Sequence, residues 1–157
     1  MANLRRMSWT VATFLLVTCS LRLAAAAEPP SDLCSLLPVA VASKTVGHPY
    51  DAPRKTVAPR PYKNTAEGTD CTYQSKSGNL LFRAYVDPSP AAATELFARL
   101  KSFFGSGSTS VPSLGDEAYV DVSHGLHVRK GKVRFFLSGS ATDKQLKDLA
   151  NEVSGRL

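Results

Sequence analysis

Apolar residues near the C-terminus recur with the period of an α-helix. Five of them lie at positions i, i+3, i+4, i+7 and i+11, which places them on one helix face: Leu146, Leu149, Ala150, Val153 and Leu157. Thr142 and Gln145 precede this stripe at the spacing of a capping box, in which each side chain bonds a backbone N–H of the other residue. The sequence therefore predicts a helix that begins after Thr142 and packs against a core.

A second helical period begins in the middle of the chain. Ser89 is a favoured N-cap residue, and Pro90 suits the first helical position, where its missing N–H removes no hydrogen bond. Six apolar residues then recur at helical spacing and predict one buried face: Ala93, Leu96, Phe97, Leu100, Phe103 and Phe104. Gly105 is expected to end this helix.

Residues 29–67 divide at Gly47. Two short helical pieces are expected before it, separated by Pro38, which can start a helix but not lie within one. Residues 48–67 contain four prolines and four basic residues, and proline opposes both a helix and a central strand. We therefore expect a proline-rich basic loop over residues 48–67, with a short edge strand at residues 56–58 as an option.

Alternation of apolar and polar residues indicates strands. Residues 80–86 alternate with a period of two and are expected to pair with residues 71–75 across a polar turn. Residues 126–129 and 133–138 form a second predicted hairpin, in which glycine supplies the backbone conformation of the turn. A further strand is expected over residues 118–122.

These elements predict an α+β fold, an antiparallel sheet with helices packed on one face. Residues 80–101 and 133–153 each run from a strand through a short polar turn into a capped helix. This likeness favours two β-β-α units, although unrelated segments also converge on so common a motif. Residues 28–157 are expected to form a single domain, long enough for one hydrophobic core.

Residues 1–27 have the layout of a secretory signal peptide. Arg5 and Arg6 precede an apolar stretch, and the alanines at 24–27 offer small side chains for cleavage. Cys19 follows Leu-Val-Thr, which is similar to the lipobox of bacterial lipoproteins except for the threonine. The sequence predicts an exported protein, periplasmic or extracellular, with membrane contact only if Cys19 is lipidated.

The charge of the chain argues against a nucleic-acid partner. Three of the 19 Lys and Arg residues lie within residues 1–27, whereas all 13 Asp and Glu residues lie beyond them, so residues 28–157 carry a net charge of +3. A charge of this size favours solubility and is too small for the footprint of a protein that binds nucleic acid.

Two cysteines, Cys34 and Cys71, lie beyond the predicted signal segment. An even pair in an exported chain indicates a disulfide, which for a loop of this length stabilises a fold by about 4 kcal/mol in the chain-entropy model. A metal site and a nucleophilic cysteine are the alternatives, although neither cysteine has a second thiol or a histidine nearby in the sequence. No cofactor is expected.

His124 and His127, with Asp121 just before them, are weak candidates for metal ligands. Two imidazoles and a carboxylate can hold zinc or copper, but this pair straddles a predicted turn and does not share a helix face. The sequence contains no nucleophile elbow, no phosphate-binding loop and no dinucleotide-binding glycine motif. We therefore assign no catalytic residue.

The strands also predict a second sheet face. If their apolar side chains point toward the helices, the alternate side chains point away. These combine basic and aromatic residues: Arg83, Tyr85, His127, Arg129, Arg134 and Phe136. Such a face can dock an anionic ligand or a protein. Because arginine and tyrosine are also common on a solvated sheet face, it is a weak candidate binding surface.

Short motifs spread over most of residues 28–157 stand in a characteristic order. They are Asp32-Leu33-Cys34-Ser35-Leu36-Leu37, Cys71-Thr72-Tyr73, Leu114-Gly115-Asp116-Glu117-Ala118-Tyr119, Leu126-His127-Val128-Arg129-Lys130-Gly131 and a final helix ending in Arg156-Leu157. This order resembles a family of small exported and lipoprotein domains of unknown function, best known from actinobacterial cell envelopes. The resemblance implies an α+β fold and a Cys34–Cys71 disulfide, and it implies no activity.

The sequence therefore predicts a non-enzymatic binding or accessory module of the bacterial cell envelope. Its expected partner is an unknown envelope protein or an anionic ligand. The alternative is a small secreted hydrolase or metal-dependent enzyme that uses His124 and His127.

Overall fold

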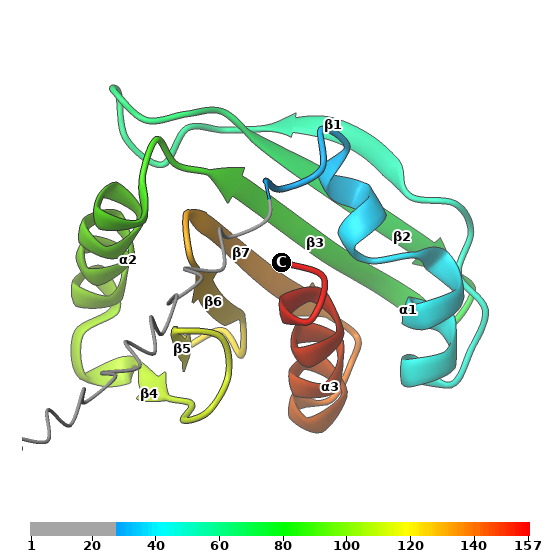
Figure 1. The fold of residues 1–157 in the computed structure, drawn as a ribbon. Coiled ribbons are helices and arrows are strands. Elements are labelled where there is room, and N and C mark those ends of the chain that lie inside the picture. Colours follow the sequence, from blue (N-terminus) through cyan, green and yellow to red (C-terminus); the bar gives the residue numbers. More distant parts are fainter. Residues whose placement is uncertain (1–27) are drawn as a thin grey trace, which may run out of the picture.

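The computed structural model describes residues 28–157, so the predicted signal segment and Cys19 lie outside the described residues. The described chain forms one seven-stranded antiparallel sheet with the order β1-β2-β3-β7-β6-β5-β4 (Figure 1). Its strands are β1 Arg54–Ala58, β2 Gly68–Ser75, β3 Gly78–Val86, β4 Thr109–Ser110, β5 Glu117–Val120, β6 Leu126–Lys130 and β7 Val133–Gly139. The predicted α+β class and antiparallel sheet are confirmed.

Two meanders build this sheet and meet at its centre. β1, β2 and β3 are consecutive neighbours, as are β4 to β7, and β3 pairs with β7. In that central pair Phe82 lies opposite Leu137 and Ala84 lies opposite Phe135. Both predicted hairpins are present, and the edge strand at residues 56–58 is the end of β1, which begins within the expected loop at Arg54.

The helices begin and end close to the predicted residues. They are the 3-10 helices η1 Leu33–Leu36 and η2 Gly105–Gly107 and the α-helices α1 Val39–Val46, α2 Pro90–Phe104 and α3 Asp143–Ser154. The Ser89 hydroxyl caps α2 by accepting from the backbone N–H of Ala92, and Thr142 with Gln145 completes the predicted capping box of α3. Gly47 ends α1 with a φ of 87°, a left-handed conformation that glycine adopts without strain.

The main hydrophobic core lies between one sheet face and the layer formed by η1, α1 and α3. α1 contacts α3, α3 packs on β6 and β7, and η1 lies against β2. The strands contribute every second side chain, among them Phe82 and Phe135, whose rings meet edge to face with centroids 5.9 Å apart. Leu149 is the fully buried centre of the α3 stripe.

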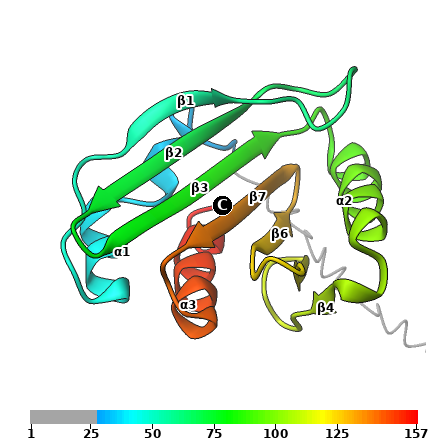
Figure 2. The same cartoon turned by 180° about the vertical axis from the view of Figure 1, so that it is seen from behind.

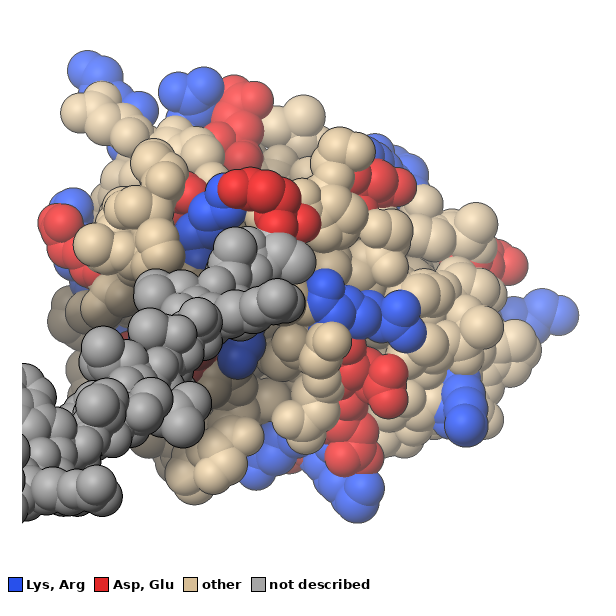
Figure 3. Space-filling view, viewed as in Figure 1, with Lys and Arg blue, Asp and Glu red and all other residues tan. Residues whose placement is uncertain are grey.

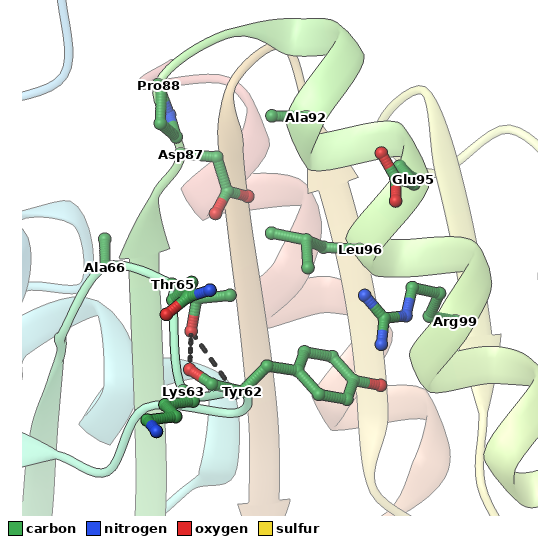
Figure 4. Close-up of a pocket in the computed structure, with 11 residues that line it drawn as sticks. Tyr62, Lys63, Thr65, Ala66, Asp87, Pro88, Ala92, Glu95, Leu96 and Arg99 are labelled. Carbon is green, nitrogen blue, oxygen red and sulfur yellow. Dashed lines mark hydrogen bonds between the residues drawn. The ribbon is translucent and has the colours of Figure 1, made fainter.

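α2 lies on the opposite face of the sheet, which corrects the expectation that all helices share one face. Its Phe97 packs on Tyr119 of β5 with ring centroids 5.1 Å apart, whereas the neighbouring Ala118 belongs to the main core. In Figure 4 α2 lies in front of β7 and α3 lies behind it, and Figure 2 views the whole fold from behind. The two strand–helix segments are therefore not equivalent β-β-α units, because their helices cover opposite faces.

The disulfide predicted from the cysteine count joins Cys34 of η1 to Cys71 of β2. Both residues are buried. The Tyr73 hydroxyl, two residues further along β2, donates a hydrogen bond to the carbonyl of Leu37. These two links fasten the N-terminal helical segment to the sheet.

No helix within residues 28–157 combines the length and the apolar character that a membrane span requires. Charged side chains of both signs are interspersed over the described residues visible in Figure 3.

Candidate functional site

The space between α2 and the sheet is lined by aromatic side chains that surround one histidine. The His127 ring stacks on Tyr119, with centroids 4.6 Å apart and planes 11° from parallel. Phe136 and Phe104 approach the same imidazole at centroid distances of 4.6 Å and 5.5 Å. His127, Tyr119 and Phe136 all point away from the main core because strand residues alternate between faces.

His127 makes its polar contact with Asp121, at the end of β5. The imidazole Nε2 lies 2.8 Å from a carboxylate oxygen of Asp121. The other oxygen accepts from the backbone N–H groups of Ser123 and Gly125, at 2.7 Å and 3.0 Å. Asp121 therefore fixes both the turn between β5 and β6 and the orientation of the histidine ring.

The two groups have shifted pKa values. Burial lowers the pKa of His127 below its ordinary value, and the bond and the charge of Asp121 offset only part of this effect. Burial alone would raise the pKa of Asp121, but the bonds from His127, Gly125 and Ser123 outweigh it and leave that pKa lowered. The pair therefore consists of a neutral imidazole and a carboxylate at neutral pH.

Two arginines beside the cluster each bind a carboxylate through two hydrogen bonds. Nε and Nη2 of Arg83 donate to Asp70 at 2.6 Å and 2.8 Å. Arg134 binds Asp87 in the same way, with Nη2 at 2.9 Å from Oδ1, and both of these side chains are buried. Such bidentate pairing fixes the plane of each guanidinium.

Two glycines leave room for neighbouring aromatic rings. A Cβ on Gly68 would lie 2.5 Å from the ring of Tyr85, and one on Gly125 would lie 2.3 Å from the ring of Phe136.

The Tyr85 hydroxyl connects β3 to the segment after β1, because it donates a hydrogen bond to the carbonyl of Pro59 at 2.9 Å. We call residues 59–66, which follow β1 and lie beside α2, the strap.

These groups line a half-open pocket of about 300 Å³, here named the aromatic pocket. Three elements form it: the first part of the strap, α2, and the outer face of β3, β6 and β7. Its walls are Pro59, Arg60, Pro61, Arg83, Tyr85, Phe97, Leu100, Phe104, Asp121, His127, Arg134, Phe135 and Phe136.

A second, more polar cavity of about 500 Å³ lies between the rest of the strap and α2 (Figure 4). Asp87 and Leu96 point into it, and the Tyr62 ring points toward Arg99, whose guanidinium carbon is 4.3 Å from the ring centroid. The carboxylate of Asp87 is paired with Arg134, a residue of the aromatic pocket, so this salt bridge lies between the strap cavity and the aromatic pocket.

The structure gathers five residues of the predicted binding surface around the aromatic pocket: Arg83, Tyr85, His127, Arg134 and Phe136. The sixth, Arg129, instead pairs with Asp116 at 3.0 Å. The expectation of an open docking face is wrong for Tyr85 and Arg134, which are buried. The reason is that α2 and the strap cover this side of the sheet.

The two histidines do not converge. His124 lies on the turn after β5, is 81% exposed and has Nδ1 3.7 Å from Asp143, whereas His127 is turned toward Asp121. Within residues 28–157 no three His, Cys, Asp or Glu side chains form a group suited to a metal ion.

Sequence reasoning missed the α2 and strap sides of the site. Phe97, Leu100 and Phe104 were expected in the common core, and Pro59 and Pro61 were expected in a solvated loop. The proline content of residues 48–67 was the available signal for the strap, since long loops are often functional. The α2 stripe offered no signal, because six apolar residues over about four turns are typical of a helix on a single core.

Comparison with protein-family models and with curated protein sequences found no match to this chain.

Proposed function

We propose that this protein is an exported, non-catalytic binding module of the bacterial cell envelope and that the aromatic pocket is its ligand site. The observation that carries the proposal is a half-open pocket beside α2 that combines aromatic walls, arginine side chains and one histidine. Ligand sites typically combine such apolar walls with a few fixed polar groups.

Two observations support the location. The Cys34–Cys71 disulfide favours an oxidising compartment, and residues 1–27 have the layout of an export signal. The order of motifs that resembles small envelope domains agrees with this placement. Lipidation at Cys19 would add a membrane tether.

The binding role is favoured over the enzymatic alternative by the surroundings of the histidines. A metal-dependent hydrolase built on His124 and His127 needs both imidazoles at one ion, and here they face different carboxylates. The second carboxylate oxygen of Asp121 accepts hydrogen bonds from backbone N–H groups, which is typical of an aspartate that forms a turn.

The proposed ligand site can be tested by a substitution that fills the aromatic pocket with a larger side chain. Leu100 lines the aromatic pocket and Leu96 lines the strap cavity one turn earlier on the same helix, and both are partly buried. We expect neutral probes such as 1-octanol and 3-phenylpropanol to shift backbone NMR signals around His127 and Phe136. Leu100→Trp should abolish these shifts, and the matched control Leu96→Trp should retain them.

Shifts that survive Leu100→Trp, or that concentrate on the strap cavity, would contradict the proposed site. Folding of each variant is checked by the dispersion of its amide spectrum, so that loss of binding is read only from a folded protein.

A further inference from the structure

The charges around the aromatic pocket are not symmetric. Arg60, Arg83 and Arg134 line its wall, but the carboxylates that pair with them, Glu67, Asp70 and Asp87, do not. Three arginines thus belong to the wall of the pocket, whereas the carboxylates bonded to them do not.

The single carboxylate of the wall is already satisfied. Asp121 accepts from two backbone N–H groups and contacts the His127 imidazole. In contrast, Arg134 uses Nε and Nη2 on Asp87, and its Nη1 makes no hydrogen bond within residues 28–157. The remaining polar groups of the wall are the cationic donors of the arginines and one neutral acceptor, Nδ1 of the His127 imidazole.

The volume of the aromatic pocket and its apolar side chains indicate what the uncharged part of a ligand would be. Four aromatic rings, Leu100 and two prolines offer apolar contact: Tyr85, Phe97, Phe104, Phe136, Pro59 and Pro61. A pocket of about 300 Å³ lies at the lower end of the range of small-molecule sites, which is about 300–1,000 Å³. A small organic ligand therefore matches this space.

We infer that the aromatic pocket selects a small amphipathic anion, whose acidic group lies at the arginines and whose apolar body lies against the α2 aromatic side chains. This inference rests on the proposed function, because it names the chemical class of ligand for the same site. Carboxylate and phosphate share the required chemistry, since both accept hydrogen bonds from guanidinium groups.

Probes of equal chain length separate charge from hydrophobicity: octanoate, 1-octanol, octyl phosphate and octylammonium. Isothermal titration calorimetry at low salt and neutral pH should show octanoate or octyl phosphate binding about tenfold more tightly than octanol, and octylammonium binding least tightly. The better of the two anions identifies the acidic group. Added salt should weaken the binding of the anion and leave that of octanol nearly unchanged.

Removing one positive charge from the pocket wall tests whether the preference for anions arises there. Arg60 is 52% exposed and belongs to the pocket wall, so Arg60→Gln preserves the fold and should weaken the binding of the anion about threefold. It should leave octanol binding unchanged. Arg54→Gln on β1 removes the same charge outside the pocket wall and should alter neither.

Equal or tighter binding of octanol or octylammonium than of both anions would overturn the anion assignment and leave the pocket as a ligand site. Equal loss in Arg60→Gln and Arg54→Gln would also overturn it, because the effect would then be one of overall charge. If none of the probes binds to the wild-type protein, the proposed function fails as well.

Discussion

His127 is a neutral imidazole held by aromatic rings and one carboxylate. Burial lowers its pKa, and the nearby Asp121 raises it by less. Because the unfolded chain takes up the proton at the ordinary value of 6.5, the unfolded state binds more protons than the folded state below that pH. The stability that this group contributes is therefore complete above about pH 6.5 and is lost as the pH falls toward the folded pKa.

An NMR titration of the imidazole checks this directly. We expect the midpoint for His127 to lie below 6.5, and Asp121→Asn to lower it further because the group that favours the charged imidazole is removed. Urea unfolding at about pH 7 and about pH 5.5 should show the lower free energy of unfolding at the acidic value. A midpoint above 6.5 would mean that the carboxylate outweighs burial.

At the scale of elements, α2 is held to the sheet by Phe97. This ring is 1% exposed against Tyr119, whereas Phe103, six residues later on the same helix, is 83% exposed. Phe97→Ala should lower the free energy of unfolding by about 3–5 kcal/mol, since it opens a cavity under the helix. Phe103→Ala, which removes the same atoms, should change it by less than about 0.5 kcal/mol.

Urea unfolding curves of the two variants provide the measurement. Similar losses for both would show that the helix is held by its whole apolar stripe and not by this contact.

Local patterns predict the elements because their causes are local. The caps at Ser89 and Thr142 and the alternation in β3 each depend on a few neighbouring residues, and all three are observed. Phe103 was expected on the buried face of α2 and is exposed. Helical spacing identifies the apolar face of a helix. Which residues of that face are buried depends on where the helix lies on the sheet.

The site was harder to predict because it depends on which sheet face each helix covers. A face of alternating basic and aromatic residues has the same sequence whether it meets water or α2. The partner of Arg134 is Asp87, 47 positions away, where the sequence indicates only the end of a strand. Strand alternation therefore predicted a basic aromatic surface, and the three-dimensional arrangement makes most of it a pocket wall.

For the whole molecule, the disulfide anchors the first helical layer. Replacing Cys34 and Cys71 together by serine should lower the free energy of unfolding by about 4 kcal/mol in the chain-entropy model, because the unfolded chain regains the freedom of the closed loop. Thermal and urea unfolding measure the loss, and reduction of the wild-type protein should reproduce it. A double variant as stable as the oxidised protein would contradict this account.

The arrangement of the two meanders has a kinetic consequence. β1 to β3 and both cysteines lie in the first half of residues 28–157, and only the β3–β7 pair joins this half to the rest of the sheet. Nearby segments close quickly, whereas contacts between distant segments carry a larger entropic cost. Oxidation of the thiols therefore need not wait for the C-terminal strands, and of all the strand pairs we expect that between β3 and β7 to close last.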